Sequence, residues 1–463
     1  MPRSAPMRSC STTSLRVPPP SARRPSRWAR PPPNRFPMPS SEGPTAPMRI
    51  LMISSLYPPF VRGGAEICAH NLATWLAGEG HEVSVLTTTP DPAQETWGAI
   101  EDGCRIYRVS PPRAYSPFDA GDAPGWKKPL WHLQDLFDPR NVALMDRVLD
   151  DVRPDFVNIQ YIQGLGYNAM TAIGRRGIPA VFTLHDLGLT CVRMSMFVDG
   201  KECNGLCTPC RASAGVKMRY LRSMEHLGFI SPSTANLQKL QSFQPVGDYP
   251  CHRVLNPNEY PSPTVGREET DTVRLLYVGR LHSSKGVQVL LEALDGLDPA
   301  LDFTLDILGS GPDEAEWRAR YGDKPWARFA GHVSLQDVAD RMENSDLLLV
   351  PSIWNENSPG VIIQALIQGL PVMGSDKGGI PELVQHGENG LLVEAGSVSA
   401  WRTAIVGLLA DPAQLAPLRA NALAATGRFA KTTLSHEALS VFEKILAGAP
   451  EAIRAQPLAG VHA

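Results

Sequence analysis

An acidic side chain stands beside the predicted start of a helix in residues 351–382 (PSIWNENSPGVIIQALIQGLPVMGSDKGGIPE), which suits a ligand carrying both phosphate and hydroxyl groups. The apolar residues 347–350 predict a buried strand, and the Asn- and Pro-rich residues after it predict a loop at its carboxyl end. A helix capped by Asn357 or Ser358 would direct free N–H groups and its positive dipole end towards phosphate oxygens. Glu356 would repel phosphate and is suited to accept hydrogen bonds from hydroxyls. The segment therefore predicts a site for a phosphorylated sugar.

Two cations, Arg280 and Lys285, follow a second predicted strand at residues 274–278. Cations five residues apart are usually a solvated pair. Both would lie at the carboxyl end of that strand or in the first helical turn after it.

Two further positions lie between a predicted strand and the segment that follows it. Gly63 and Gly64 lack a Cβ, so phosphate or an acceptor can approach the backbone closely, although such a pair alone is more often a turn. No G-x-G-x-x-G segment occurs in the sequence, which argues against a dinucleotide dehydrogenase. His185 follows residues 180–184, and a lone His in such a place is more often a structural hydrogen bonder than a ligand contact.

The elements that position these residues form two similar series. Predicted strands alternate with helical patterns and, after a polar, Pro-rich link from Asn256, the alternation begins again, which predicts an α/β fold of two Rossmann-like, doubly wound domains facing across a cleft. The predicted strands are residues 50–54, 83–87, 105–109, 156–160 and 180–184 in the first series, and 274–278, 305–308, 328–330, 347–350 and 372–374 in the second.

Three separated segments carry a resemblance to a known family: MRILMISSLYPPFVRGGAEICAHNLATWLAGEGHEVSVLTT, LLYVGRLHSSKGVQVLLEAL and residues 351–382. In this order they resemble the retaining glycosyltransferases of family 4, which have the GT-B fold, over nearly all of the chain from Met48 onward. The resemblance implies that a sugar moves from a nucleotide diphosphate sugar to a hydroxyl acceptor, in polysaccharide, glycolipid or glycoconjugate synthesis. No cofactor is then required for transfer, and the absence of an Asp-x-Asp motif from the sequence agrees with metal-independent chemistry.

The resemblance also implies roles for individual residues. Arg280 and Lys285 would bind the donor diphosphate, Glu356 would hold sugar hydroxyls, and His185 would reach the transferred sugar. The remaining implied donor contacts are Gly63, Gly64, Ser358, Pro359, Gly360, Val361 and Gln364.

Gln364 departs from the family pattern, which is Glu, seven residues, then a second Glu that holds the ribose. With the amide of Gln364 in place of a carboxylate, one charge-assisted hydrogen bond to the ribose becomes a neutral one, which weakens donor binding by about 1 kcal/mol. Gln364 is therefore the sequence argument for a rival function, a catalytically weak or silent sugar-nucleotide-binding protein. A sugar-nucleotide epimerase or phosphorylase of the same fold is the other alternative.

Four cysteines crowd into residues 191–210, namely Cys191, Cys203, Cys207 and Cys210. Their spacing suits a tetrahedral structural zinc site. An iron–sulfur cluster and unligated or redox-active thiols remain open as alternatives. After them comes a basic, partly apolar stretch (Arg211, Lys217, Arg219, Tyr220, Leu221 and Arg222), which is either a solvated helix face or a peripheral contact with anionic lipid or a diphosphate-linked acceptor.

Composition limits the remaining choices. Residues 1–47 are rich in Pro, Ser and Arg and predict a disordered tail or a start codon assigned too far upstream. Without their eight Arg and one Glu, the 44 basic and 47 acidic residues of the chain become 36 and 46, so nucleic acid is not expected as a partner. No apolar run reaches the ~18 residues of a membrane span, and we expect a cytoplasmic protein, at most at the inner face of the membrane.

The expected domains follow from these patterns. An amino-terminal, acceptor-side domain covers residues 48–258 and carries the Cys-rich insert 191–210. The nucleotide-sugar-binding domain covers residues 259–430. Residues 431–463 hold a terminal helix, which is expected to pack back on the first domain, and a tail.

Overall fold

The computed structural model describes residues 46–119, 123–198 and 200–449. The predicted tail, residues 1–47, lies almost wholly outside these residues, as does the end of the chain after residue 449. No helix among the described residues is both long and apolar enough to cross a membrane.

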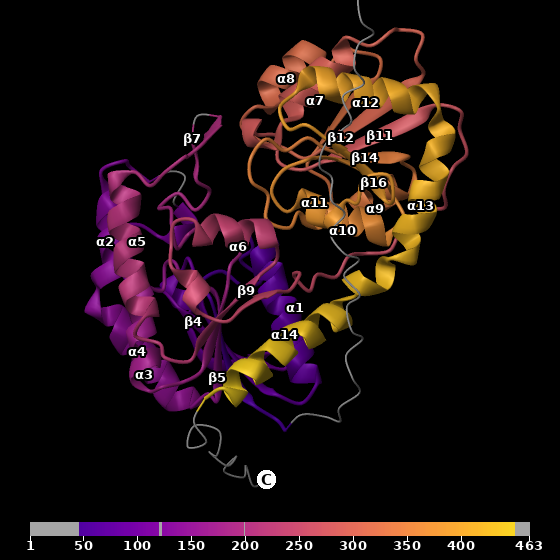
Figure 1. Cartoon of the computed structure of the whole chain (residues 1–463). Coiled ribbons are helices and arrows are strands. Elements are labelled where there is room, and N and C mark those ends of the chain that lie inside the picture. Colours follow the sequence, from indigo (N-terminus) through magenta and orange to yellow (C-terminus); the bar gives the residue numbers. More distant parts are fainter. Residues whose placement is uncertain (1–45, 120–122, 199, 450–463) are drawn as a thin grey trace, which may run out of the picture. The chain divides into compact units, whose positions relative to one another are not determined.

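The first half of the described chain is built on an eight-stranded sheet with the strand order β10-β9-β6-β5-β1-β2-β4-β3 (Figure 1). All neighbouring strands are parallel except β3, which pairs antiparallel with β4 at one edge. The strands are β1 (Arg49–Ser54), β2 (Glu82–Thr88), β3 (Thr96–Glu101), β4 (Cys104–Val109), β5 (Phe156–Tyr161), β6 (Ala180–Thr183), β9 (Leu227–Ser231) and β10 (Cys251–Arg253).

Helices follow the parallel strands in this half. They are α1 (Gly64–Gly78), α2 (Lys127–Phe137), α3 (Pro139–Val152), α4 (Met170–Arg175), α5 (Thr208–Leu221) and α6 (Thr234–Gln241). The apolar strand β1, RILMIS, lies at the centre of the sheet with Leu51 opposite Ser84 on one side and Val157 on the other. Because both faces of the sheet are covered, β1 is apolar along its length instead of alternating.

The second half holds a six-stranded, wholly parallel sheet with the order β13-β12-β11-β14-β15-β16. Its strands are β11 (Val273–Val278), β12 (Phe303–Leu308), β13 (Ala327–Gly331), β14 (Leu347–Val350), β15 (Val372–Ser375) and β16 (Gly390–Val393). Its helices are α7 (Val287–Asp295), α8 (Glu314–Tyr321), α9 (Leu335–Glu343), α10 (Gly360–Ile367), α11 (Ile380–Leu383), α12 (Val398–Ala410) and α13 (Leu415–Ala424). The chain order steps outward from β11 to β13 and then returns to β14 beside β11, so the topological switch point lies between β11 and β14. The predicted fold class, two α/β domains with parallel sheets, is confirmed.

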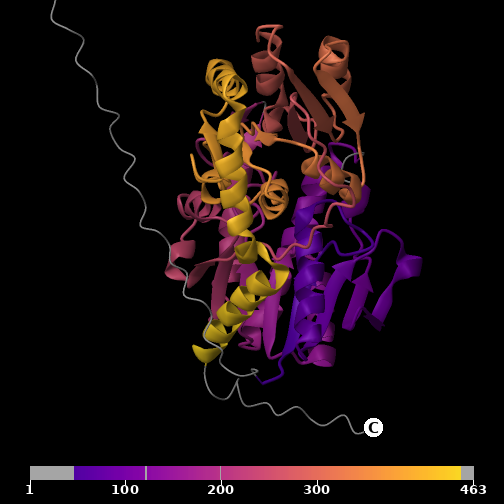
Figure 2. The ribbon, with the colours of Figure 1, turned by 90° about the vertical axis from the view of Figure 1, so that its right-hand side faces the viewer.

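The terminal helix α14 (Lys431–Ala447) packs mainly on the first sheet, while Leu434 in its first turn joins the core of the second half. Phe442 stacks on Phe156 of β5 with the ring centroids 4.8 Å apart, and His436 meets Trp75 of α1 at 4.6 Å. Both views of the ribbon show α14, in yellow, beside the indigo α1 (Figures 1 and 2). The last helix therefore joins the core of the first half.

Candidate active site

Lys285 and Glu356 meet at the switch point of the second sheet. Lys285 Nζ donates to Glu356 Oε1 at 2.7 Å, and Ser352 Oγ donates to the same oxygen at 2.7 Å. Burial acts to raise the pKa of Glu356, but the charge and hydrogen bond of Lys285 and the hydrogen bond of Ser352 outweigh it, so this pKa lies below its ordinary value. The carboxylate is therefore charged although its residue is only 6 % exposed.

Close contact between two loops holds this pair together. Gly286 follows Lys285 with φ 70°, and a Cβ at that position would collide with the carbonyl oxygen of Pro351. Ile353 N donates to Ser284 O at 3.0 Å. The turn after β11 is thus pinned to the loop after β14, because a residue without a side chain lets the two backbones touch.

Arg280 lies in the same turn after β11. Its carbonyl oxygen accepts from the hydroxyl of Tyr277 at 3.0 Å, and its exposed guanidinium makes no hydrogen bond or ion pair with any described residue. The side chain is therefore free to meet an anionic ligand, since an Arg in an ion pair would have to give up its partner first.

Helix α10 begins without a side-chain cap. Its N-cap residue is Pro359, so the prediction that Asn357 or Ser358 caps this helix is wrong. The buried hydroxyl of Ser358 has no hydrogen-bond partner among the residues described. A Cβ on Gly360 would come within 2.7 Å of the Tyr260 hydroxyl, which explains the glycine. The first N–H groups of α10 and this hydroxyl are available to oxygen atoms of a ligand.

Gln364 lies within α10 and is 3 % exposed. Its amide nitrogen makes no hydrogen bond within the described part of the chain. An unpaired buried amide nitrogen can donate to a ligand oxygen or to a water molecule.

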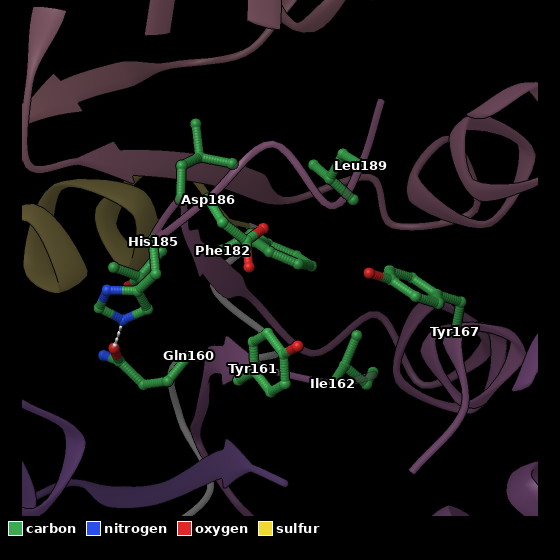
Figure 3. A pocket seen from close by; sticks show the side chains of 10 residues that line it. Gln160, Tyr161, Ile162, Tyr167, Phe182, His185, Asp186 and Leu189 are labelled. Carbon is green, nitrogen blue, oxygen red and sulfur yellow. Dashed lines mark hydrogen bonds between the residues drawn. The ribbon is translucent and has the colours of Figure 1, made fainter. Parts of the chain in front are cut away.

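His185 follows β6 and is held by a buried chain of polar side chains. Its Nε2 lies 2.6 Å from Gln160 Oε1 (Figure 3). Gln160 Nε2 in turn donates to Asn158 Oδ1 at 3.2 Å. The amide oxygen can only accept, so Nε2 carries the proton and Nδ1 is left as an acceptor. Burial lowers the pKa of His185 to about 4, so the ring is neutral near pH 7.

Asn357 connects the acidic loop with the histidine loop. Its Nδ2 donates to the carbonyl oxygens of Leu184 at 2.8 Å and His185 at 3.0 Å, and its Oδ1 accepts from Ser233 Oγ at 2.8 Å. Glu382 of α11 makes a second connection between the two halves of the chain, because its carboxylate accepts a hydrogen bond from Nε of Arg253 in β10 at 2.7 Å. Glu356 and His185, which are 171 positions apart in the sequence, are therefore linked through one amide side chain.

A small cavity of about 10 Å³ lies behind His185. It is lined by Gln160, Tyr161, Ile162, Tyr167, Phe182, Thr183, Leu184, His185, Asp186 and Leu189. Figure 3 shows the imidazole turned towards Gln160 and away from the phenol of Tyr167. About one water molecule fits this volume, so the cavity is too small to hold a sugar. A sugar ring would have to meet His185 from outside it.

A buried lysine holds the loop after His185 in place. Lys217 of α5 is 4 % exposed, donates to the carbonyl oxygen of Gly188 at 2.6 Å and lies 4.3 Å from the centre of the Tyr167 ring. Asp186 accepts from Gly188 N at 2.6 Å, and burial raises the pKa of Asp186 to about 6. The interpretation of Lys217 as part of a solvated or lipid-binding face is therefore wrong, because its ammonium group points into the core.

Gly63 and Gly64 begin α1. Gly63 is the N-cap residue, and its N–H donates to Glu66 Oε2 at 2.9 Å. A Cβ on Gly64 would meet nothing within 4 Å, so packing among the described residues does not require glycine there. The open space is suited to a ligand, but Glu66 already takes one N–H group of this helix start.

The four cysteines do not form a metal site within the described residues, where no group of three or more His, Cys, Asp or Glu side chains is arranged to hold a metal ion. Cys191 and Cys210 are buried with their sulfur atoms 3.8 Å apart, Cys203 is half-buried and Cys207 is exposed. Hydrogen bonds from the backbone and side chain of Cys210 lower the pKa of Cys207, and burial raises the pKa of Cys210 to about 12. The arrangement does not support the predicted zinc site. It is that of an exposed, acidic thiol beside a buried one.

Sequence reasoning did not find Ser352, Gln160, Asn357 as a bridge, or the buried Lys217. Each acts through contact with residues distant in the sequence. The PSIWNENSPG segment does contain Ser352 and Asn357, but their partners follow only from the fold.

Comparison with known proteins shows the family of the chain. The Glycosyl transferase 4-like domain matches residues 63–235, and the Glycosyl transferases group 1 family matches residues 272–411. The glycogen synthase of Mycobacterium tuberculosis is 27 % identical over 390 residues, which cover 79 % of this chain and 87 % of that protein. The D-inositol 3-phosphate glycosyltransferase of Xylanimonas cellulosilytica is 26 % identical over 407 residues, covering 85 % and 94 %.

Solved structures show the same fold. Sucrose-phosphate synthase from Thermosynechococcus elongatus superposes with a TM-score of 0.65 at 20 % identity, covering 86 % of this chain and 99 % of that one. HepE of Anabaena in complex with UDP and glucose superposes with a TM-score of 0.59 at 19 % identity and the same coverage. The chain therefore belongs to the group 1 glycosyltransferases of family 4, and it is a glycosyltransferase with the GT-B fold.

Proposed function

We propose that this glycosyltransferase moves a sugar from a nucleotide diphosphate sugar to a hydroxyl acceptor, with retention of configuration and without a divalent metal. The observation that supports the proposal most strongly is the Lys285–Glu356 pair, pinned between the turns after β11 and β14 and connected through Asn357 to His185. A cation for the diphosphate, a carboxylate for sugar hydroxyls and a neutral imidazole then share one neighbourhood.

Positive charge takes the place of a metal in this mechanism. An ammonium group has three N–H donors, and Glu356 occupies one of those of Lys285, so two remain for phosphate oxygens. Arg280, without a partner among the described residues, adds a forked donor. As the bond between the anomeric carbon and the diphosphate breaks, both groups stabilise the charge on the leaving oxygen.

Binding contacts orient the donor sugar. Glu356 Oε2 and His185 Nδ1 accept from sugar hydroxyls, and the N–H groups at the start of α10 with the hydroxyl of Ser358 donate to the donor. Gln364 takes the place of the family's ribose-binding Glu.

No side chain of this group is a strong base. Burial lowers the pKa of His185 to about 4, and in Glu356 the charge of Lys285 outweighs burial and holds the pKa below its ordinary value. The acceptor hydroxyl therefore attacks the anomeric carbon on the face from which the diphosphate leaves, and its proton passes to the departing phosphate oxygen. The products are a glycoside of unchanged configuration and a free nucleoside diphosphate. Atoms and charges balance without a further reactant.

The test is release of nucleoside diphosphate in the presence and absence of an acceptor. UDP-glucose is the first donor to try, because HepE of Anabaena was solved with UDP-glucose. Glycogen, inositol phosphate and phosphatidylinositol are the first acceptors, after the names of relatives with 27–35 % identity. Acceptor-dependent release that persists in EDTA supports the proposal. Donor binding without turnover for any pair would support the silent binding protein.

A further inference from the structure

Large apolar side chains lie on the outer face of α2, where a globular helix normally carries polar residues. Trp126, Leu130, Leu133 and Phe137 are 72 %, 46 %, 54 % and 52 % exposed. Their spacing of four, three and four residues places them within an arc of about 60°, since an α-helix turns about 100° per residue. Trp126 has helical backbone angles although it precedes the first turn. We call these four side chains the α2 stripe.

The α2 stripe is not the result of a loosely attached helix. Trp131, on the opposite side, is 5 % exposed and stacks on Tyr115 with the ring centroids 5.6 Å apart. Asp135 is 1 % exposed and accepts from Gly164 N at 2.7 Å. The helix is therefore firmly docked through one face, and the apolar stripe is what remains outside.

The surroundings of the stripe are basic. Lys127 and Lys128 begin α2, and the only acidic residue of that helix is the buried Asp135. The neighbouring helix α5 contains no acidic residue, and its exposed side carries Arg211 and Arg219, followed by Arg222.

The two helices lie side by side (Figure 1), joined by a hydrogen bond of 2.7 Å from the Tyr220 hydroxyl to the carbonyl oxygen of Leu136. This local excess of positive charge stands out in a chain whose net charge is −3.

We propose that the α2 stripe and the basic residues beside it bind the anionic surface of a lipid bilayer. Trp and basic side chains favour the headgroup region, while Leu and Phe enter the boundary of the acyl chains. The stripe is about 17 Å long at 1.5 Å per residue, which fits a helix lying in the plane of the interface and not across it. The proposal does not depend on which sugar is transferred.

A second copy of the chain fits this surface less well. A symmetric contact places the same patch on both partners, so Lys127, Lys128 and the α5 arginines of two copies would face one another. Like charges at close range oppose such a contact, whereas anionic headgroups neutralise them. Charge thus favours a membrane over self-association.

The experiment is co-sedimentation of the whole protein with two kinds of vesicle. One is made of phosphatidylcholine alone, and the other contains phosphatidylcholine with about 30 mol% of the anionic lipid phosphatidylglycerol. The stripe variant is Leu130→Gln with Leu133→Gln and Phe137→Gln. The matched control is Leu335→Gln with Leu423→Gln, two side chains of the second half that are 62 % and 50 % exposed. A charge variant, Lys127→Glu with Lys128→Glu, tests the electrostatic part, and circular dichroism melting verifies that each variant folds.

We expect the wild type and the control to bind the anionic vesicles, and binding to plain phosphatidylcholine to be about tenfold weaker or more. The stripe variant and the charge variant should each lose about tenfold in affinity. The proposal is overturned if the folded stripe variant binds vesicles as well as the control does, or if the wild type binds neither kind of vesicle. A concentration-dependent dimer that only the stripe variant loses, without vesicle binding, would assign the surface to a second copy. The membrane-binding proposal is also refuted if an acidic protein retains the wild type while neither kind of vesicle does.

Discussion

Replacement of Lys285 by Met tests the ion pair at the centre of the site. The side chain keeps most of its length but loses its charge, so the loop contacts around Gly286 should remain. Without the ammonium group, the leaving diphosphate loses a charge-assisted contact, and we expect turnover to fall by roughly 10²-fold or more, which is about 2.7 kcal/mol of transition-state stabilisation. Initial rates of nucleoside diphosphate release measure this directly.

The same change should alter stability in a pH-dependent way. In the wild type, the pKa of Glu356 is below its ordinary value, so its contribution to stability is present above the unfolded pKa and is lost as pH falls through the folded pKa. Without Lys285, burial raises that pKa above the unfolded value, and the charged carboxylate then destabilises the fold at neutral pH. Loss of a buried partner costs about 3 kcal/mol, the lower end of the usual range, because the Lys285 side chain is 27 % exposed.

Urea unfolding at pH 7 and pH 5 gives the measurement. The stability deficit of the Lys285→Met variant should be largest at pH 7 and should shrink at pH 5, where Glu356 of the variant begins to take up a proton. A double variant with Glu356→Gln should show no such pH dependence. Turnover within threefold of wild type, or a deficit equal at both pH values, would refute the reasoning.

Three further predictions follow from individual side chains. Gln364→Glu should lower the Michaelis constant for the donor by about tenfold, or ~1.4 kcal/mol, with little change in turnover, because the ribose is remote from the breaking bond; an unchanged Michaelis constant would mean that this position does not hold the ribose. Because burial lowers the pKa of His185 to about 4, its imidazole should stay neutral between pH 6 and pH 8, and a ¹⁵N spectrum of labelled histidine should show one Nε2-protonated ring that does not titrate in this range. The Gln160→Leu variant should lose the preference for this tautomer. If the His185 ring of the wild type titrates near pH 6.5, the assignment is contradicted. Cys207 should react with iodoacetamide at pH 7.5 at least about tenfold faster than Cys210, since its pKa is lowered and it is exposed; equal rates, or stoichiometric zinc in protein purified without added metal, would contradict the free-thiol arrangement.

Local patterns were sufficient to predict the sheets and the loops of the site. Runs such as residues 347–350 are apolar because both faces of a parallel strand are covered, and each of the ten predicted strands overlaps an observed one. Strands β3, β9, β10 and β16 were not predicted, nor was the two-stranded sheet of β7 (Phe197–Val198) and β8 (Lys201–Glu202). β3 lies at an edge with its residues half exposed, and β10 has only three residues, so neither gives a strong pattern.

The contacts between distant segments could not be predicted from the sequence. The position of Asn357 in the sequence predicts a helix cap, but its side-chain amide donates hydrogen bonds to two backbone carbonyl groups that follow β6. Lys217 reads as a surface charge among arginines, yet its ammonium group is buried because Gly188 O lies within reach. The α2 stripe has the spacing of a core-facing helix, and periodicity alone does not say which face of a helix is inside. In each case the tertiary partner decides the role.

The anomeric configuration of the product tests the central claim most directly. The protein is incubated with UDP-glucose and an accepted hydroxyl acceptor, and the configuration at the anomeric carbon of the new glycoside is read from its anomeric proton by NMR. Attack on the face of the leaving diphosphate predicts a product with the configuration of the donor and an equal amount of free nucleoside diphosphate. A glycoside of inverted configuration would contradict the proposed mechanism, and nucleoside diphosphate released without any glycoside would contradict transfer itself.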